Sequence, residues 1–395
     1  MSGTIVAFAP GVWGWPHFAG SPRYHLWTLA GMGWRVLYVE PPVKLRVKPE
    51  TWKAPDREFH VLKPALIPPF AMRFARGVPG AAWRRLVSMK LAGAAMAEVR
   101  RLDFAPDIFW FGAPWHGDLP LFLPKAPLRV SHTYDELSES PTLSARQSEM
   151  LWRWEQTLHR ECAIVLCSSL PQKQRREGLA AETVLLENAV RDDFLEPPKP
   201  SDHATLAKLR ALPHPRYVYG GVADLRLDPR LFAELLNRIR EGSLVFLGAK
   251  TGTLDSNFAA ISLSPRTHFL GAIPYDLFPA LYAESDVLLI GHLRNAFTDA
   301  MYPEKLNEYL ASGKPVVSID LPEVARVAST APTGAIRVVA TATEFANAAI
   351  AAAAEADSVL QEERRAIARQ RTWSVMGALL DTTLRTALAK RKGTP

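Results

Sequence analysis

Residues 301–320 read MYPEKLNEYLASGKPVVSID, a short helical pattern followed by a strand-like apolar run. Pro303 suits the first turn of a helix, Gly313 suits the position just past its end, and Pro315 prevents its continuation. Within this short helix Lys305 and Glu308 place two opposite charges one turn apart. A solvated helix face would explain them, and so would a bound ligand.

Strand-like runs alternate with helical patterns on both sides of this stretch. The runs are TIVAFAP, RVLYVEP, FHVLKPAL, DIFWFG, LRVSHTY, AIVLCSS and TVLLENAV in the first half, and RYVYGGV, SLVFLGA, THFLGAI, DVLLIGH, KPVVSID and IRVVA in the second. Near-continuous apolar strands separated by helices are typical of parallel sheets covered on both faces. The predicted fold class is α/β, with doubly wound sheets that bind ligands at the carboxyl ends of their strands.

The alternation breaks at LEPPKPSDH, where three prolines stand among polar residues. Such composition is typical of an inter-domain linker. We therefore expect an N-terminal domain over 1–195, a linker over 196–203, a C-terminal domain over 204–370 and a C-terminal helix over 371–395.

The composition is that of a globular protein, with 48% hydrophobic and 22% charged residues in 395. No apolar run reaches the length of about 18 residues expected of a transmembrane helix, and the N-terminus does not have the pattern of a signal peptide. Two cysteines in an apolar run suit reduced thiols in a buried strand. These features predict a cytoplasmic location.

The net charge of +7 is concentrated in residues 41–101, which carry thirteen Lys and Arg against four Asp and Glu. The segment also contains Trp52, Phe59, Phe70 and the apolar stretch ALIPPFAM. Basic charge mixed with aromatics suits an anionic membrane surface, and a basic helix face with no partner is the alternative. No nucleic-acid motif accompanies the charge, so nucleic acid is not an expected partner.

The combination of LGAI, DVLLIGH and YPEKLNEYLASGKPVV resembles nucleotide-sugar glycosyltransferases of the two-Rossmann-domain (GT-B) class. It is most similar to bacterial teichuronic-acid and exopolysaccharide enzymes, including the xanthan glucuronosyltransferase type. YDELSES and VLLENAVRDDF add to the likeness. The resemblance implies two Rossmann-like domains that face a central cleft, the N-terminal one binding the acceptor and the C-terminal one binding the donor.

The chemistry of Lys305 and Glu308 agrees with this resemblance. They lie about 60° apart on one flank of the helix. An ammonium in the first turn, together with the free N–H groups there, favours a diphosphate. A carboxylate accepts hydrogen bonds from both hydroxyls of a ribose. A surface ion pair between them is the alternative, worth only a few tenths of a kcal/mol.

The resemblance implies further donor contacts. In the resembling enzymes the loop that holds Ala272 and Ile273 meets the base. His292 and Arg294 lie at the carboxyl end of another strand, which suits contact with the diphosphate or donor sugar; ordinary loop residues are the alternative. Gly220 and Gly221 follow the first strand of the domain, where missing side chains would let the backbone approach phosphate. A tight turn without a ligand explains these two glycines equally well. The last group leads into the helix: Tyr302, Pro303 and Glu304.

An inverting transfer needs a base for the acceptor hydroxyl. The resemblance implies Asp135, which follows a strand, with Glu136 as a neighbouring substitute; an N-cap is its ordinary alternative. His17, in a glycine-containing loop after the first strand, is a second candidate. Many retaining members of the class carry an acid eight positions before the ribose glutamate. That position is Ala300 here, with Asp299 beside it, so the acidic pattern is missing or shifted, which favours inversion.

These features predict a metal-independent glycosyltransferase with a UDP-linked donor and no other cofactor. Its acceptor would be a glycan or lipid-linked molecule of cell-surface polysaccharide or glycolipid synthesis. The enzyme would sit peripherally on the inner face of the cell membrane through residues 41–101. A nucleotide-sugar epimerase and a non-catalytic nucleotide-binding protein are the alternatives.

Overall fold

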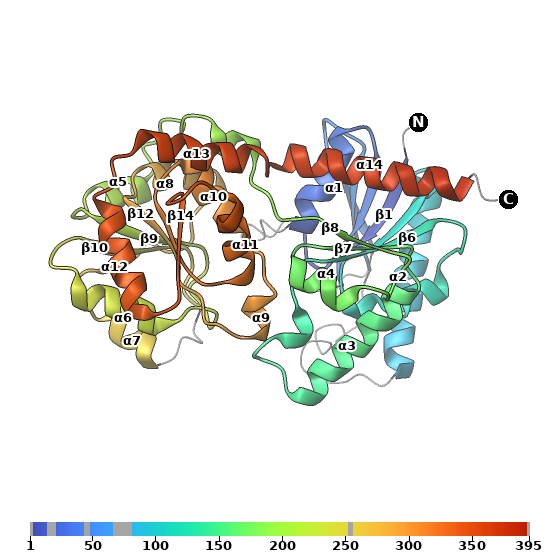
Figure 1. Cartoon of the computed structure of the whole chain (residues 1–395). Coiled ribbons are helices and arrows are strands. Elements are labelled where there is room, and N and C mark those ends of the chain that lie inside the picture. The colour runs from blue at the N-terminus through green and yellow to red at the C-terminus, as the bar shows by residue number, and fades with distance from the viewer. Residues whose placement is uncertain (1–2, 14–20, 43–47, 66–80, 252–255, 393–395) are drawn as a thin grey trace. The chain divides into compact units, whose positions relative to one another are not determined.

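The computed structural model describes residues 3–392 with the exception of 14–20, 43–47, 66–80 and 252–255 (Figure 1). The chain divides into two compact units. Unit 1 comprises Met1–Glu187 with Met376–Pro395, and unit 2 comprises Asn188–Val375. Among the residues that the structure describes, every helix is too short or too polar to cross a lipid bilayer.

Unit 1 contains an eight-stranded sheet in the order β3-β4-β2-β1-β5-β6-β7-β8. Its pairings are parallel except for the edge pair of β3 with β4. The strands are β1 Thr4–Phe8, β2 Arg35–Val39, β3 Glu50–Lys53, β4 Phe59–Lys63, β5 Ile108–Phe111, β6 Leu128–Thr133, β7 Ile164–Cys167 and β8 Glu182–Leu185.

Successive side chains along each unit 1 strand point to opposite faces of the sheet, and each face carries its own apolar layer. Ile5 and Ala7 of β1 join one layer, whereas Val6 and Phe8 join the other. Helices α1 and α14 cover the first face, and α2 and α3 cover the second (Figure 1). The helices of unit 1 are α1 Ser21–Gly31, α2 Ala81–Arg101, α3 Ala145–Arg160, α4 Leu170–Arg176 and α14 Trp373–Lys392, with short turns η2 Pro114–His116, η3 Leu119–Phe122 and η4 Leu137–Glu139.

Unit 2 contains a parallel six-stranded sheet in the order β11-β10-β9-β12-β13-β14, built around its own apolar core. The strands are β9 Arg216–Gly220, β10 Ser243–Leu247, β11 Thr267–Phe269, β12 Val287–Ile290, β13 Val316–Ile319 and β14 Ile336–Val339. The helices are α5 Ala204–Arg210, α6 Pro229–Arg238, α7 Ser256–Ser262, α8 Phe278–Ala283, α9 Ala296–Asp299, α10 Glu304–Ser312, α11 Pro322–Thr330, α12 Ala342–Ala353 and α13 Ser358–Arg369, with turns η5 Asp192–Leu195 and η6 Tyr275–Leu277.

The predicted α/β class is confirmed, and each of the thirteen predicted strand segments overlaps a strand. The sequence reasoning missed β3, whose residues ETWK are all exposed and show no apolar run. Its backbone pairs with β4 at the sheet edge, a contact that hydrophobic periodicity does not report.

The change of unit falls between Glu187 and Asn188, and not at the proline-rich stretch 196–203. Asn188 belongs to unit 2 because its side-chain amide donates to the Tyr302 carbonyl at 2.8 Å. Val190 is bridged to Thr372 in the same unit. The compact units therefore divide before the expected domain boundary at 195, since contacts, and not prolines, define a compact unit.

Candidate functional site

The order of strands in unit 2 reverses at β9, which has β10 on one side and β12 on the other. In open α/β sheets, ligands bind outside the carboxyl ends of the strands at such a switch point. Gly220 ends β9, and His292 follows the end of β12. An isolated bridge between Leu227 and His292 joins the two loops that follow these strands.

Helix α10 begins at Glu304 with Pro303 as its N-cap, and Gly313 follows its end with φ of 77°. This left-handed conformation suits glycine, so the local sequence explains both ends of the predicted helix. Leu306 and Leu310 are buried in the core of unit 2. The helix therefore holds its charged flank at a fixed place beside the sheet.

Lys305 lies against the end of β9. Its Nζ donates a hydrogen bond to Tyr219 Oη at 2.8 Å and lies 4.4 Å from the centroid of that ring. His292 Nε2 is 3.5 Å away. Burial, with a smaller contribution from Arg226, lowers the pKa of Lys305 to about 7. A bound anion would favour the charged form of this lysine.

A second cation, Arg226, lies in the loop after β9 and was missed by the sequence reasoning. It pairs with Asp224 through Nε–Oδ1 and Nη2–Oδ2 bonds of 2.9 and 2.7 Å. Its charge contributes to the lowered pKa of Lys305. An arginine in the loop after the first strand of a doubly wound domain was the available signal. Two cations beside a helix N-terminus suit a diphosphate.

His292 is buried, and burial holds its pKa well below the usual range. Its Nδ1 has no hydrogen-bond partner in the described part of the chain. A buried polar atom without a partner is rare in native proteins and is one mark of a functional site. The predicted role of His292 as a donor contact therefore keeps physical support.

Glu308 is only 7% exposed, and each of its carboxylate oxygens accepts a hydrogen bond from a tyrosine. Tyr275 Oη lies 2.6 Å from Oε1, and Tyr282 Oη lies 2.9 Å from Oε2. Burial raises the pKa of Glu308, whereas these hydroxyls and Lys305 oppose that shift. The sequence reasoning identified Glu308 but neither of its tyrosine partners.

Gly220 and Gly221 are required for different reasons. A Cβ at Gly220 would lie 2.4 Å from Tyr282 Oη, so packing excludes a side chain there. Gly221 has φ of 120°, and a Cβ there would lie 3.4 Å from Lys305 Nζ. The glycine at 221 keeps the backbone open beside the lysine, as the prediction for this loop requires.

The loop after β11 contains the two residues predicted to meet the base. Ala272 is exposed, whereas the side chain of Ile273 packs in the core of unit 2. The structure therefore leaves only the backbone of this pair and the Ala272 methyl group for a ligand. Gly271 precedes them with φ of 77°, which a turn of this kind needs.

The remaining predicted donor residues differ in their placement. Arg294 is exposed and is bonded to Asp299 and to the Asp320 carbonyl. Pro303 is buried as the N-cap of α10, and Glu304 is half-buried in its first turn.

Tyr302 departs from the prediction. Its side chain is 1% exposed and donates to Asn307 Oδ1 at 3.0 Å. The ring therefore packs in the core of unit 2, where it supports the start of α10 and is not open to a ligand.

In unit 1, Asp135 follows the carboxyl end of β6 and is half-buried. It lines a small cavity of about 10 Å³ together with Gly112, Ser131, His132 and Tyr134. The cavity lies where β5 and β6 end, the edge at which doubly wound sheets bind ligands. His17 lies outside the described residues.

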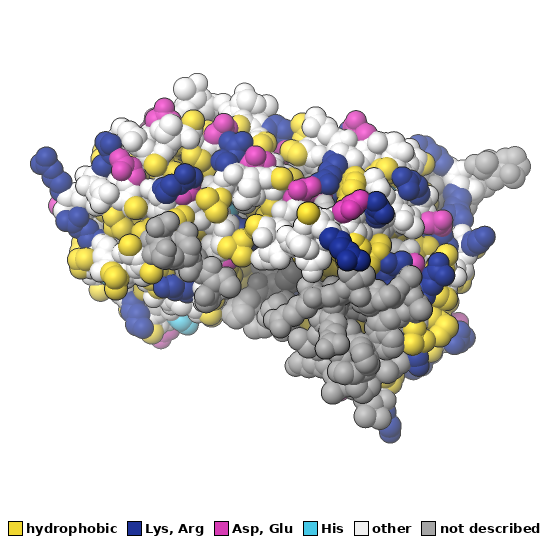
Figure 2. Space-filling model, turned by 90° about the horizontal axis from the view of Figure 1, so that it is seen from below, with side chains coloured by type: hydrophobic (Ala, Val, Ile, Leu, Met, Phe, Trp, Pro, Cys, Tyr) yellow, Lys and Arg dark blue, Asp and Glu magenta, His cyan; other side chains and the backbone are white. Residues whose placement is uncertain are grey.

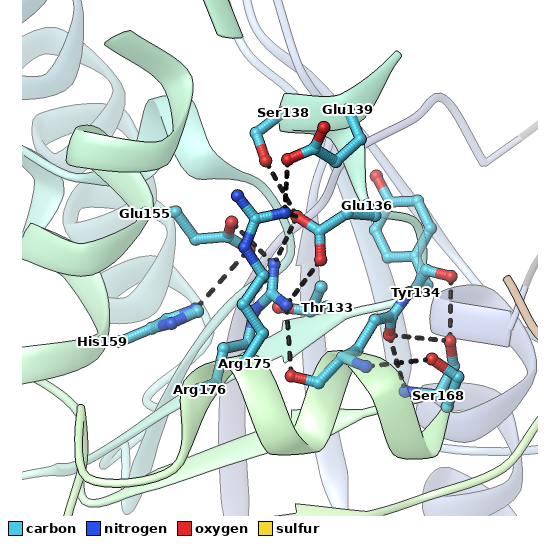
Figure 3. Close-up of polar contacts among 12 residues, drawn as sticks. Thr133, Tyr134, Glu136, Ser138, Glu139, Glu155, His159, Ser168, Arg175 and Arg176 are labelled. Atoms are coloured by element: carbon cyan, nitrogen blue, oxygen red, sulfur yellow. Dashed lines mark hydrogen bonds and ion pairs between the residues drawn. The ribbon is translucent and has the colours of Figure 1, made fainter. Parts of the chain in front are cut away.

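Glu136 cannot replace Asp135 as a base, because it belongs to a buried ionic cluster (Figure 3). Arg176 binds it through two bonds of 2.7 and 3.0 Å and also binds Glu155 at 2.8 Å. Arg176 and Glu136 are almost fully buried. The cluster fixes the segment that follows β6, and with it the backbone of the neighbouring Asp135.

The basic segment 41–101 is described in part, since 43–47 and 66–80 lie outside the described residues. Several of its described cations are already paired within unit 1. Arg84 pairs with Asp118, and Arg101 with Glu98. On the face shown in Figure 2, Lys and Arg side chains are scattered among apolar and acidic ones.

Comparisons with known proteins agree with this geometry. Residues 223–355 match the family described as Glycosyl transferases group 1. No curated protein matches the sequence significantly.

Among solved structures, sucrose-phosphate synthase from Thermosynechococcus elongatus is similar with a TM-score of 0.73 and 16% identity, covering 99% of this chain and 100% of that one. An α,α-trehalose-phosphate synthase (UDP-forming) from Burkholderia vietnamiensis has a TM-score of 0.71 and 14% identity, with 100% of both chains covered. A trehalose-6-phosphate protein from E. coli bound with UDP-2-fluoro glucose has a TM-score of 0.69 and 11% identity, covering 97% of this chain and 99% of that one.

The chain therefore has the GT-B fold, and its second unit carries the sequence pattern of group 1 glycosyltransferases. The matched segment includes Arg226, His292, Lys305 and Glu308.

Proposed function

We propose that the protein is a glycosyltransferase that moves a sugar from a nucleotide-diphosphate donor to an acceptor hydroxyl. One observation carries the proposal. Helix α10 presents Lys305 and Glu308 side by side at the switch point of the unit 2 sheet, within a segment that matches group 1 glycosyltransferases. The lysine would bind the diphosphate, and the carboxylate would bind the ribose.

The chemistry of transfer needs stabilisation of the leaving nucleoside diphosphate. Lys305, Arg226 and the free N–H groups of the first turn of α10 supply positive potential at one place. These groups are held before the charge develops on the leaving oxygen, which is the condition under which electrostatic stabilisation is strongest.

The donor is proposed to be UDP-linked. The E. coli structure of similar fold is bound with UDP-2-fluoro glucose, and the Burkholderia enzyme is described as UDP-forming. We propose that transfer needs no metal and no further cofactor, because Lys305 and Arg226 supply two cations that could bind a diphosphate. The test is full activity after dialysis against EDTA, and a loss that Mg²⁺ restores would contradict it.

The position of Asp135 after the carboxyl end of β6 supports its choice as the base. We propose that Asp135 takes the proton from the acceptor and that the reaction inverts the anomeric centre, with His17 as the alternative base. Asp135→Asn should lower turnover while UDP affinity stays nearly unchanged, because the residue acts on the acceptor. Normal transfer by this variant would exclude the role.

The acceptor is proposed to be a glycan or lipid-linked molecule of cell-surface polysaccharide or glycolipid synthesis, met at the inner face of the cell membrane. The excess of Lys and Arg over residues 41–101 supports this proposal. Co-sedimentation with anionic liposomes at low salt, and its loss at high salt, is the expected result. Absence of sedimentation at low salt would contradict membrane contact.

Titration calorimetry with UDP tests the donor site. Lys305→Met and Glu308→Gln should each weaken UDP binding by about tenfold or more, since each removes a charge-assisted hydrogen bond. Lys208→Met is the matched control, because Lys208 is exposed on α5. Unchanged affinity in both site variants would remove the proposal.

Product analysis separates the other functions. An epimerase would convert the nucleotide sugar without any acceptor, and a binding protein would bind UDP with neither transfer nor donor hydrolysis.

A further inference from the structure

The carboxylate of Glu308 is held by two tyrosines from separate elements. Tyr275 belongs to η6 and Tyr282 to α8, while Glu308 lies on α10. Their hydroxyls donate to different oxygens, at 2.6 Å for Tyr275 to Oε1 and 2.9 Å for Tyr282 to Oε2. Packing of the core alone would not require a carboxylate at this place.

The tyrosine rings are themselves fixed. The Arg191 guanidinium lies 5.0 Å from the centroid of the Tyr275 ring and is bonded to Asp193 and Asp276. The Tyr282 ring packs edge-to-face on Tyr309 with centroids 5.2 Å apart. Each hydroxyl therefore reaches Glu308 from a ring that has little freedom to move.

The number of hydrogen-bond acceptor positions on the carboxylate limits what Glu308 can bind. An ionised carboxylate has two oxygens and about four lone-pair positions. Each tyrosine uses one position on one oxygen, which leaves one position on each oxygen. Two free positions on neighbouring oxygens match two hydroxyls on adjacent carbons.

We propose that Tyr275 and Tyr282 are positioning residues that orient Glu308 and keep it ionised for the two adjacent hydroxyls of a ribose. The inference rests on the proposed nucleotide-sugar site and adds to it the device by which that site selects ribonucleotides over deoxyribonucleotides.

The charged and titratable groups around Glu308 predict a pH signature. They are Lys305 and Tyr309 on its own helix, Arg191 before η5, Tyr275 on η6 and Tyr282 on α8. Burial raises the pKa of Glu308, and the tyrosine hydroxyls oppose that rise. Removing one hydroxyl should raise this pKa further, so ribose binding should be lost at a higher pH on acidification.

Tyr275→Phe tests the proposal in the full-length protein, with Tyr217→Phe near the amino end of β9 as the matched control. Calorimetry would compare UDP with its 2′-deoxy, 3′-deoxy and 2′,3′-dideoxy analogues. We expect Tyr275→Phe to weaken UDP by about tenfold, from loss of one hydrogen bond to a charged group, and to leave the dideoxy analogue nearly unchanged. The acidic limb of UDP binding should move to higher pH, and Tyr282→Phe should act in the same direction.

Tighter UDP binding by Tyr275→Phe would overturn the inference. It would mean that the Tyr275 hydroxyl competes with the ribose for the Glu308 carboxylate. Equal losses for UDP and the dideoxy analogue would overturn it as well. If Glu308→Gln weakens UDP but Tyr275→Phe does not, the inference fails and the nucleotide site stands. If wild-type protein fails to bind UDP, the proposed function itself fails.

Discussion

Lys305 sits between two protonation states at neutral pH, since burial lowers its pKa to about 7. A diphosphate would bind the charged form and raise that pKa, so binding should take up a proton. We predict that affinity for a UDP-sugar falls as the pH rises through about 7. Calorimetry in two buffers of different ionisation enthalpy measures the uptake. Lys305→Arg should abolish it, because arginine stays charged.

The same shift predicts the effect of Lys305 on stability without ligand. A lysine in the unfolded chain has a pKa near 10.4, so between about pH 7 and 10 the unfolded state binds a proton that the folded state lacks. The lysine therefore destabilises the fold at neutral and acidic pH, and the free energy of unfolding rises with pH through this window. Lys305→Met should raise the melting temperature near neutral pH while UDP binding is weakened. A lowered melting temperature would contradict this.

Gly220 provides a test of packing next to the site. Its missing Cβ leaves room for Tyr282 Oη, which would lie 2.4 Å from a methyl group there. We predict that Gly220→Ala lowers the free energy of unfolding by about 1–3 kcal/mol through overpacking. Adding Tyr282→Phe should recover part of that loss, which urea denaturation of the single and double variants would measure. Strictly additive effects would show that the two groups do not meet.

The features of the site that could be predicted are those that depend on residues close together in the sequence. The ends of α10 followed from Pro303, Gly313 and Pro315, and its charged flank followed from helical spacing. Its partners were not predictable, because Lys305 meets Tyr219 of β9 and Glu308 meets Tyr275 and Tyr282. Contacts between residues so far apart in sequence depend on the register of the whole sheet.

Two adjacent arginines on α4 allow a test of how burial changes the contribution of an ion pair to the free energy of unfolding. The Arg176 side chain is 0% exposed between Glu136 and Glu155, whereas the Arg175 side chain is 31% exposed (Figure 3). Arg176→Met would leave two buried carboxylates without this cation and should lower the free energy of unfolding by about 3–5 kcal/mol. Arg175 also lies 3.2 Å from Glu136, but its side chain is partly exposed and Arg176 still pairs with Glu136 in its absence. Arg175→Met should therefore cost less, about 1 kcal/mol. Urea denaturation of both variants is the measurement, and equal losses would contradict the assignment of the cluster.

Strands and helices were easier to predict than the limits of the two units. Apolar runs in the sequence predicted every strand of the parallel pairings, since strands buried on both faces are apolar throughout. The expected boundary followed the prolines near residue 196, whereas the contact-based division falls before Asn188, which is bonded to Tyr302.

The C-terminal helix α14 returns the chain to unit 1, and this makes the two units unequal as independent fragments. Leu380 and Leu384 of α14 are fully buried in the layer that also contains Leu26 and Trp34. Trp34 Nε1 also donates to Asp381 at 2.5 Å. By contrast, the apolar core of unit 2 is drawn wholly from residues between 190 and 368.

We therefore predict that a fragment of residues 188–375 folds and binds UDP, whereas residues 1–187 alone do not fold stably. Burying two leucine side chains contributes about 3–6 kcal/mol, a large share of the stability of an ordinary domain. Adding a peptide of residues 373–395 to fragment 1–187 should restore a cooperative thermal transition, and a peptide with Leu380→Asp and Leu384→Asp is the matched control. Circular dichroism of the two mixtures decides the matter, since a cooperative transition in fragment 1–187 without any peptide would show that α14 is not needed to complete unit 1.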